Sequence, residues 1–476
     1  MTMPTMFLRR IDPRWLLGLA VAATATWLWL CWCLFPERGW NDVRLAPLFG
    51  LRLGLPLYAG TGGPASTWMY GPLPLLLLWP ATWAVDAGHA LLIAGGINLA
   101  ISLGAILAVC AFWPGEEREL PSRVTRVSAA LLALAIWPGA TWQYLQADNS
   151  AIALGLLANL VLVRARSPLG WWAAAVLATA GLLCKQTSLS VPAAQLIWLG
   201  FTHGRGAARD HLLRLAAGGA AWSILFLLGN DLPATWFNLI LTPGALPWAD
   251  RPWQRLWDLS PFIAVHLGLP ILAWPWLRRA MSCGRLALPT WTWICAWLPG
   301  LASILKVGGT LNTLQGFPLW LPPAMVAAGA ALESRWTSRR TCAAAAMLAA
   351  GLCVWRIALL PAPPWQPRLE LYREAEQLAE AFPEQIWFPW HPLVTVFSEH
   401  RLYHVEDGLY VRFITGRPLT VAAAQRDLPR RMSVIALPRT ASDWGIALSL
   451  LPPNARKDVR GLWTLYSWPP PAAAEP

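Results

Sequence analysis

The sequence predicts an all-α polytopic membrane protein with about eleven transmembrane helices, one further interfacial or re-entrant apolar segment, and a small extracytoplasmic α/β domain at the C-terminus. Three observations support this fold class. The chain of 476 residues is 56% hydrophobic and only 13% charged. Apolar stretches of roughly 17 or more residues recur along it, long enough for ~30 Å of hydrocarbon. From about residue 361 the composition changes to that of a water-exposed domain.

The first apolar run follows a basic N-terminus and has no small-x-small cleavage site, so it reads as a retained anchor. The predicted spans are 14–35, 89–113, 124–140, 149–165, 169–184, 187–202, 211–229, 260–278, 288–305, 314–332 and 340–360. Segment 70–85 is ambiguous, because it is short and its three prolines remove backbone donors that lipid cannot replace.

Loop charge decides how segment 70–85 is counted. Arginine clusters occupy the connections at 115–126, 164–168, 203–214, 278–285 and 333–340. If 70–85 does not cross, all five connections lie in the cytoplasm with the N-terminus, as the positive-inside rule requires. We therefore predict a multi-pass protein of the inner or plasma membrane, a cytoplasmic N-terminus and an extracytoplasmic C-terminal domain. The same distribution explains the net charge of +12 without nucleic acid.

Two domains follow from this division. The transmembrane domain is 1–360, with a first extracytoplasmic loop at 36–88 in which 43–57 is expected to lie as a short helix at the interface. The C-terminal domain is 361–476; its pattern predicts a helix over 368–382 and strands at I-W-F-P-W, L-V-T-V-F and M-S-V-I-A-L-P. There His391, His404 and Glu406 could be metal ligands, but turns and satisfied polar groups are the alternative, because no tight ligand spacing links them.

Polar residues gather at the predicted outer rim, whereas the span interiors are almost free of charge apart from His266. That bare midplane counts against an ion-coupled transporter. Each polar group also has a simpler interpretation: Asp148–Asn149 as a helix N-cap, Lys185 as a snorkelling side chain, Gly308–Gly309 as a turn. Together, cations and carboxylates from separate loops on one face suit binding of a phosphate beside a general base. The groups are Asp42, Arg44, Gln146–Asn149, Cys184–Thr187, Lys306–Gln315 and Arg356.

Several of these motifs, in this order, resemble the GT-C superfamily of polyprenyl-phosphate-sugar-dependent membrane glycosyltransferases, in particular its bacterial members. They are an acid directly after the first span (Asp42), an arm ending in Y-G-P-L-P (70–74), the Q-A-D-N loop (146–149), L-L-C-K-Q-T (182–187) and K-x-G-G-x-x-N (306–312). The resemblance spans residues 1–360, and its motifs are short.

The resemblance implies transfer of a sugar from a polyprenyl-phosphate donor to an extracytoplasmic glycan or lipid acceptor, with inversion at the anomeric carbon. It implies Asp42 as the general base. No cofactor is expected except a divalent metal in those members that use one, and Asn41, where several members have a second acid, disfavours a metal at Asp42. The alternative is a non-catalytic transporter of lipid-linked sugars, or an accessory protein that binds them. The implied substrate- and phosphate-binding residues are Arg44, Tyr70, Asp148, Asn149, Lys185, Gln186, Lys306, Asn312 and Arg356.

Overall fold

The computed structural model describes residues 13–60, 63–66, 68–113, 123–136, 142–264, 271, 274–282, 284, 287–309, 311–314, 316, 320–324, 339–360, 362–439 and 445–469. Within these ranges four helices are long and apolar enough to cross a bilayer, namely Trp15–Cys33, Ala87–Phe112, Ala147–Arg164 and Gly204–Leu228. The predicted membrane location is therefore supported, and the chain is mostly helical with a small sheet near its C-terminus.

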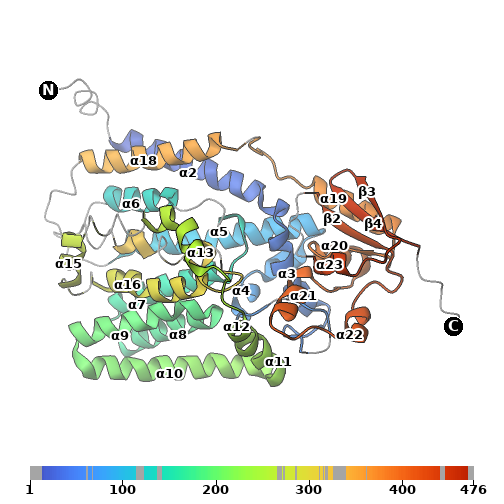
Figure 1. The fold of residues 1–476 in the computed structure, drawn as a ribbon. Coiled ribbons are helices and arrows are strands. Elements are labelled where there is room, and N and C mark those ends of the chain that lie inside the picture. Colours follow the sequence, from blue (N-terminus) through green and yellow to red (C-terminus); the bar gives the residue numbers. More distant parts are fainter. Residues whose placement is uncertain are drawn as a thin grey trace.

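The long helices form one bundle, and their bounds lie within a few residues of predicted spans, except that α10 begins at Gly204, well before the predicted start at 211. In the bundle α18 packs along α2 and α6, while α8 packs against α7 and α10 (Figure 1). Residues 265–270 and 272–273 of predicted span 260–278, with His266, and most of span 314–332 fall outside the described residues, so the count of eleven crossings stays a prediction. The bundle helices are α2 (Pro13–Cys33), α5 (Ala87–Phe112), α6 (Arg123–Ile136), α7 (Ala147–Arg164), α8 (Pro168–Cys184), α9 (Ser190–Thr202), α10 (Gly204–Leu228), α16 (Ala287–Ile304) and α18 (Arg339–Ala358).

Between the bundle and the C-terminal domain lie shorter helices. Segment 70–85 forms two brief pieces, α4 (Leu73–Leu76) and a 3₁₀ helix (Trp79–Trp83), each with a proline in its first turn, and neither is long enough to span a bilayer. The predicted interfacial helix exists as α3 (Gly39–Arg52), but α5 and α20 pack on it and most of residues 41–50 are buried, so it does not lie open on a surface. The remaining short helices are α11 (Leu232–Trp236), a short π-helix (Phe237–Leu241), α12 (Thr242–Ala245), α13 (Pro252–Asp258) and α15 (Trp274–Ser282). Of these, α15 lies at the end of the bundle opposite the C-terminal domain (Figure 1).

The C-terminal domain packs helices on a four-stranded sheet of order β1-β2-β4-β3. Strand β1 pairs parallel with β2, and the other two pairings are antiparallel. The predicted helix over 368–382 and the strands at I-W-F-P-W and M-S-V-I-A-L-P are present. Its elements are α19 (Glu370–Ala381), β1 (Ile386–Trp387), α20 (Pro392–Glu399), α21 (Glu406–Ile414), α22 (Val421–Arg426), β2 (Val434–Pro438), α23 (Ile446–Ser449), β3 (Arg456–Arg460) and β4 (Trp463–Ser467).

The predicted strand over L-V-T-V-F is wrong, because these residues form the helix α20. Their β-branched side chains favour a strand locally. Pro392 at the first helical position fits a helix start, and a carboxylate from the membrane domain accepts the Leu393 N–H, so tertiary contacts override the local preference.

Two hydrophobic clusters of the described residues join the two parts of the chain, and the larger one packs the first loop on the C-terminal domain. It contains Phe35, Leu45 and Leu48 from the first loop together with Tyr372, Phe388 and Trp463 of the C-terminal domain. Figure 1 shows this domain covering one end of the bundle, with α3 and α4 beneath it. The first loop is thereby enclosed between two packed bodies.

Within the bundle, four fully buried polar side chains form a hydrogen-bond chain that the sequence analysis missed. Thr292 Oγ1 donates to the Leu288 carbonyl (2.9 Å), so it can accept from Asn159 Nδ2 (2.8 Å); Asn159 Oδ1 in turn accepts from Gln195 Nε2 (3.0 Å). Gln195 Oε1 is an acceptor only, hence His211 Nε2, at 3.0 Å, carries the proton. The chain links α16, α7, α9 and α10.

Candidate active site

The entrance to α3 is fastened to the loop before α7 by Asn41. Its side-chain amide donates to the carbonyls of Phe35 (2.8 Å) and Gln143 (2.7 Å), and its oxygen accepts from the Leu145 N–H (2.7 Å). Arg38 adds two hydrogen bonds to the Gln143 side chain. Because the Asn41 amide is fully buried and both its nitrogen and its oxygen have hydrogen-bond partners, it fixes the start of α3 relative to the loop before α7. From the sequence alone, Asn41 was notable only because the family resemblance led us to expect a second acidic residue at this position.

Asp42, the predicted general base, faces the C-terminal domain. Its Oδ1 accepts from the Leu393 N–H at the start of α20 (2.9 Å) and its Oδ2 from the Tyr372 hydroxyl of α19 (2.9 Å). The residue is 0% exposed. In this arrangement the carboxyl group caps a helix and anchors a domain, and an acceptor hydroxyl cannot reach it without movement of α19 and α20.

Burial raises the pKa of Asp42 to about 8, although the hydrogen bonds from Leu393 and Tyr372 partly oppose the shift. Nearby His391 is also fully buried; both its ring nitrogens are without a partner among the described residues, and burial lowers its pKa to about 3. The seam between the two domains therefore favours neutral forms of both groups.

Four predicted binding residues do come together at the ends of α3, α7 and α8. Lys185 Nζ lies 2.5 Å from Asp148 Oδ2, and both side chains are nearly inaccessible. The Tyr70 ring lies between two cations, with Lys185 Nζ at 5.4 Å from its centroid and Arg44 Cζ at 5.5 Å. Arg44 also lies over Trp40, at 5.0 Å. We call Arg44, Tyr70, Asp148 and Lys185 the cationic cluster; its two cations face one carboxylate, so it carries excess positive charge.

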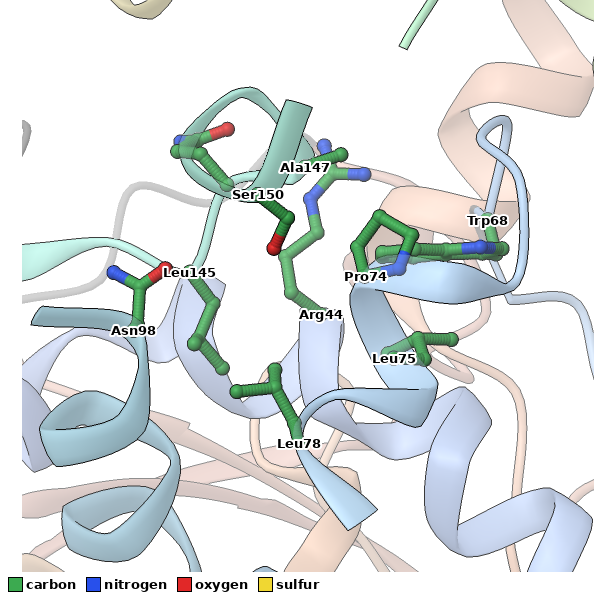
Figure 2. A pocket seen from close by; sticks show the side chains of 10 residues that line it. Arg44, Trp68, Pro74, Leu75, Leu78, Asn98, Leu145, Ala147 and Ser150 are labelled. Atoms are coloured by element: carbon green, nitrogen blue, oxygen red, sulfur yellow. The ribbon is translucent and has the colours of Figure 1, made fainter. Parts of the chain in front are cut away.

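A small pocket adjoins this cluster. Figure 2 shows Arg44 rising past Leu145 and Pro74 with its guanidinium beside Ala147, in the first turn of α7, and the Ser150 hydroxyl pointing into the same space. The volume of this pocket is about 10 Å³, roughly enough for one water molecule. A sugar phosphate needs far more room, so binding one requires these walls to separate.

The other predicted residues lie in different surroundings. Asn149 donates to Asn98 of α5 (2.9 Å), and Gln186 is exposed and donates to the Leu239 carbonyl (3.4 Å). Lys306 donates to the Pro243 carbonyl (3.1 Å) beside Trp248, and Arg356 lies over Trp27 within the α2–α18 pair. These partners lie outside the cationic cluster. The side chain of Asn312 falls outside the described residues.

Of the three suggested metal ligands in the C-terminal domain, His404 and Glu406 have other partners, whereas the ring nitrogens of His391 have no hydrogen-bond partner among the described residues. His404 Nδ1 accepts from the Ala65 N–H (2.8 Å), and Glu406 accepts from the N–H groups of Ile446 (3.0 Å) and Ala447 (2.8 Å). Among the residues with described positions, no group of three or more histidine, cysteine or acidic side chains could hold a metal ion. His404 and Glu406 satisfy backbone groups instead.

Comparison with known proteins supports the fold. No protein-family model matches the sequence, and no curated protein does. The structure is similar to that of ArnT from Cupriavidus metallidurans bound to undecaprenyl phosphate, with 12% identity, a TM-score of 0.58, and coverage of 96% of this chain and 98% of that chain. It is equally similar to ArnT in the apo state, with 12% identity, a TM-score of 0.59, and coverage of 95% and 97%. The likeness over nearly the whole of both chains shows that this chain has the same fold as ArnT.

Proposed function

We propose that this chain is a membrane glycosyltransferase that takes a sugar from a polyprenyl-phosphate donor and transfers it to an extracytoplasmic glycan or lipid acceptor. The observation that carries the proposal is a cationic cluster enclosed near the C-terminal-domain end of a bundle whose fold is shared with an undecaprenyl-phosphate-bound protein. Membrane surroundings weaken screening, so charges placed there act strongly on a phosphate.

In the proposed reaction Arg44 and Lys185 hold the donor phosphate. The acceptor oxygen forms a bond to the anomeric carbon and loses its proton to a carboxylate, while the bond from that carbon to the phosphate oxygen breaks. Negative charge then grows on the departing polyprenyl phosphate, which the two cations stabilise. Tyr70, between them, fixes their separation.

Asp42 is the proposed base, on condition that α19 and α20 withdraw from it, because a base must come within about 2.6–3.2 Å of the hydroxyl. Its raised pKa lies near the operating range of a general base. Asp148 is the second candidate, favoured by its place beside the pocket wall formed by Ala147 and Ser150. Substituting Asp42 and Asp148 one at a time shows which of the two carboxylates is the general base.

The test measures transfer of labelled sugar from a polyprenyl-phosphate donor in membranes. Asp42→Asn keeps a neutral group that can accept from Leu393 and pair with Tyr372, so docking should persist while transfer falls by about 100-fold or more. Asp42→Ala leaves both partners unpaired and should lower stability as well. Asp148 is the base if Asp42→Asn retains transfer while Asp148→Asn has none, although it is folded and still binds undecaprenyl phosphate; these two conditions are needed because the variant also removes the partner of Lys185.

The second candidate function is a non-catalytic binder or transporter of lipid-linked sugars. The purely structural bonding of Asp42 favours it, because that carboxyl group is fully used in holding the domains together. Under this reading the wild-type protein itself transfers no sugar in the membrane assay. Protein-dependent movement of the lipid across vesicles, with its sugar intact, would then replace the glycosyltransferase proposal.

A further inference from the structure

The segment that ends at Tyr70 connects the C-terminal domain to the cationic cluster. We call residues 57–60, 63–66 and 68–71 the arm. At one end the arm meets the cluster, because the Tyr70 ring lies against both Arg44 and Lys185. Trp68 stands edge-on to Tyr70, with centroids 5.4 Å apart, and lines the adjoining pocket. Any shift of the arm therefore changes the space between the two cations.

The Tyr70 end of the arm is fixed by backbone contacts. The buried Tyr58 hydroxyl donates to the Tyr70 carbonyl (2.6 Å), and Trp68 Nε1 donates to the Gly71 carbonyl (3.0 Å). Gly71 packs directly on the end of α8, where an added Cβ would lie 2.0 Å from the Leu183 carbonyl oxygen. Since Leu183 is two residues before Lys185, the arm and the lysine share one support.

The middle of the arm is docked by the C-terminal domain. The Val405 N–H donates to the Ala65 carbonyl (3.0 Å), and the Ala65 N–H donates to His404 Nδ1 (2.8 Å). Because His404 Nδ1 accepts, Nε2 carries the proton and donates to the Ala424 carbonyl (3.0 Å). The imidazole is neutral and has a partner at each nitrogen.

Helix α21 completes the docking. Arg412 Nη2 donates to the Gly60 carbonyl (2.6 Å), with the Arg412 guanidinium over the Phe237 ring at 5.5 Å. Gly408 leaves no room for a side chain, because an added Cβ would lie 2.3 Å from the Ala65 carbonyl oxygen. Close packing of this kind transmits displacement instead of absorbing it.

We propose that the C-terminal domain sets the position of Tyr70 through the arm, so that His404, Gly408 and Arg412 act as positioning residues for binding of the donor phosphate. The proposal rests on the proposed function in one respect, the identity of the ligand at the cationic cluster. A domain that must move to uncover Asp42 would, by the same movement, release the arm and widen the pocket beside Arg44. Donor binding and acceptor access would thus be coupled through one segment.

The experiment compares Gly408→Ala with Arg412→Gln, which removes the Gly60 contact without adding volume. The control is Arg426→Gln, on the exposed surface of the same domain. Two quantities are measured on the full-length protein in nanodiscs: amide hydrogen exchange of residues 63–71, and affinity for undecaprenyl phosphate. We expect faster exchange over 63–71 and about tenfold weaker binding in both variants, with the control unchanged.

Global unfolding is followed for each variant, and Arg412→Lys should restore part of the affinity because it keeps a cation near Gly60. Unchanged exchange at residues 68–71 in a folded Arg412→Gln protein would overturn the proposal. Unchanged phosphate affinity despite faster exchange would overturn it too, because Tyr70 would then not depend on the docking. If the wild-type protein does not bind undecaprenyl phosphate but the variants still show faster exchange over 63–71, the proposed function is wrong. The dependence of the arm on its contacts with the C-terminal domain would still hold.

Discussion

The ion pair between Lys185 and Asp148 gives a quantitative test of the cationic cluster. The two groups are 2.5 Å apart, and their side chains are only 7% and 4% exposed. Removing one partner of a buried pair leaves an uncompensated charge, at a cost of about 3–5 kcal/mol. Lys185→Met and Asp148→Asn should each destabilise the protein by an amount in that range.

The double variant should cost clearly less than the sum of the single variants, because no charge is stranded when both groups are neutral. A coupling energy of about 1–3 kcal/mol is expected. The assay is reversible unfolding in mixed detergent–SDS micelles, followed by tryptophan fluorescence. Arg209→Met with Asp210→Asn is the matched control, because this pair is exposed and should show almost no coupling.

Undecaprenyl phosphate binding separates stability from function in the same variants. The double variant recovers stability but lacks one of the two cations, so its affinity should remain low. Strictly additive destabilisation would refute the buried-pair reasoning. Wild-type affinity in a folded Lys185→Met protein would refute the assignment of the phosphate to this cluster.

Three further predictions concern groups outside the cluster. Burial lowers the pKa of His404, so the imidazole is neutral in the folded protein and its Nδ1 can accept from the Ala65 N–H. This hydrogen bond is therefore fully formed above the unfolded pKa of about 6.5 and is lost as the pH falls and the ring becomes protonated. Hydrogen exchange at 63–66 should accordingly quicken between about pH 7 and pH 5, and a pH-independent rate (after correction for intrinsic exchange) would contradict this. His391→Leu should raise the unfolding free energy by about 1 kcal/mol or more, because two buried ring nitrogens without partners are removed; a lower unfolding midpoint would argue that His391 is needed. Gln195→Leu should destabilise the bundle by about 2–4 kcal/mol, since it strands His211 Nε2 and interrupts the polar chain, and an unchanged midpoint in detergent would show that the chain contributes nothing.

The helical bundle was predictable because bilayer insertion imposes a local rule. A span needs a continuous apolar run, so α2, α5, α7 and α8 begin and end within a few residues of the predicted positions. The sequence placed Arg44, Asp148 and Lys185 on one predicted face, which permitted their convergence without requiring it, and it pointed to Tyr70 only through the family resemblance. Their spacing along the chain left the actual contacts open.

The interpretation of Asp42 needed the tertiary structure. Its sequence position beside the first span indicated a rim-exposed acid, but its partners Tyr372 and Leu393 lie more than three hundred residues later. The same distant contact turned L-V-T-V-F from a predicted strand into α20. Local propensity carries no information about a partner that far along the chain.

By itself, therefore, the sequence determined the membrane location, most helices of the bundle and a resemblance to GT-C glycosyltransferases, because hydropathy, loop charge and short motifs are properties of local segments. Only the tertiary structure decided which of the predicted cations and carboxylates meet. It buried Asp42 against Tyr372, gave Asn41 a bracing role between two loops, and placed Tyr70 under the control of the C-terminal domain. Each of these outcomes depends on packing between segments that are remote in sequence, where burial and hydrogen-bond partners are set jointly by both sides.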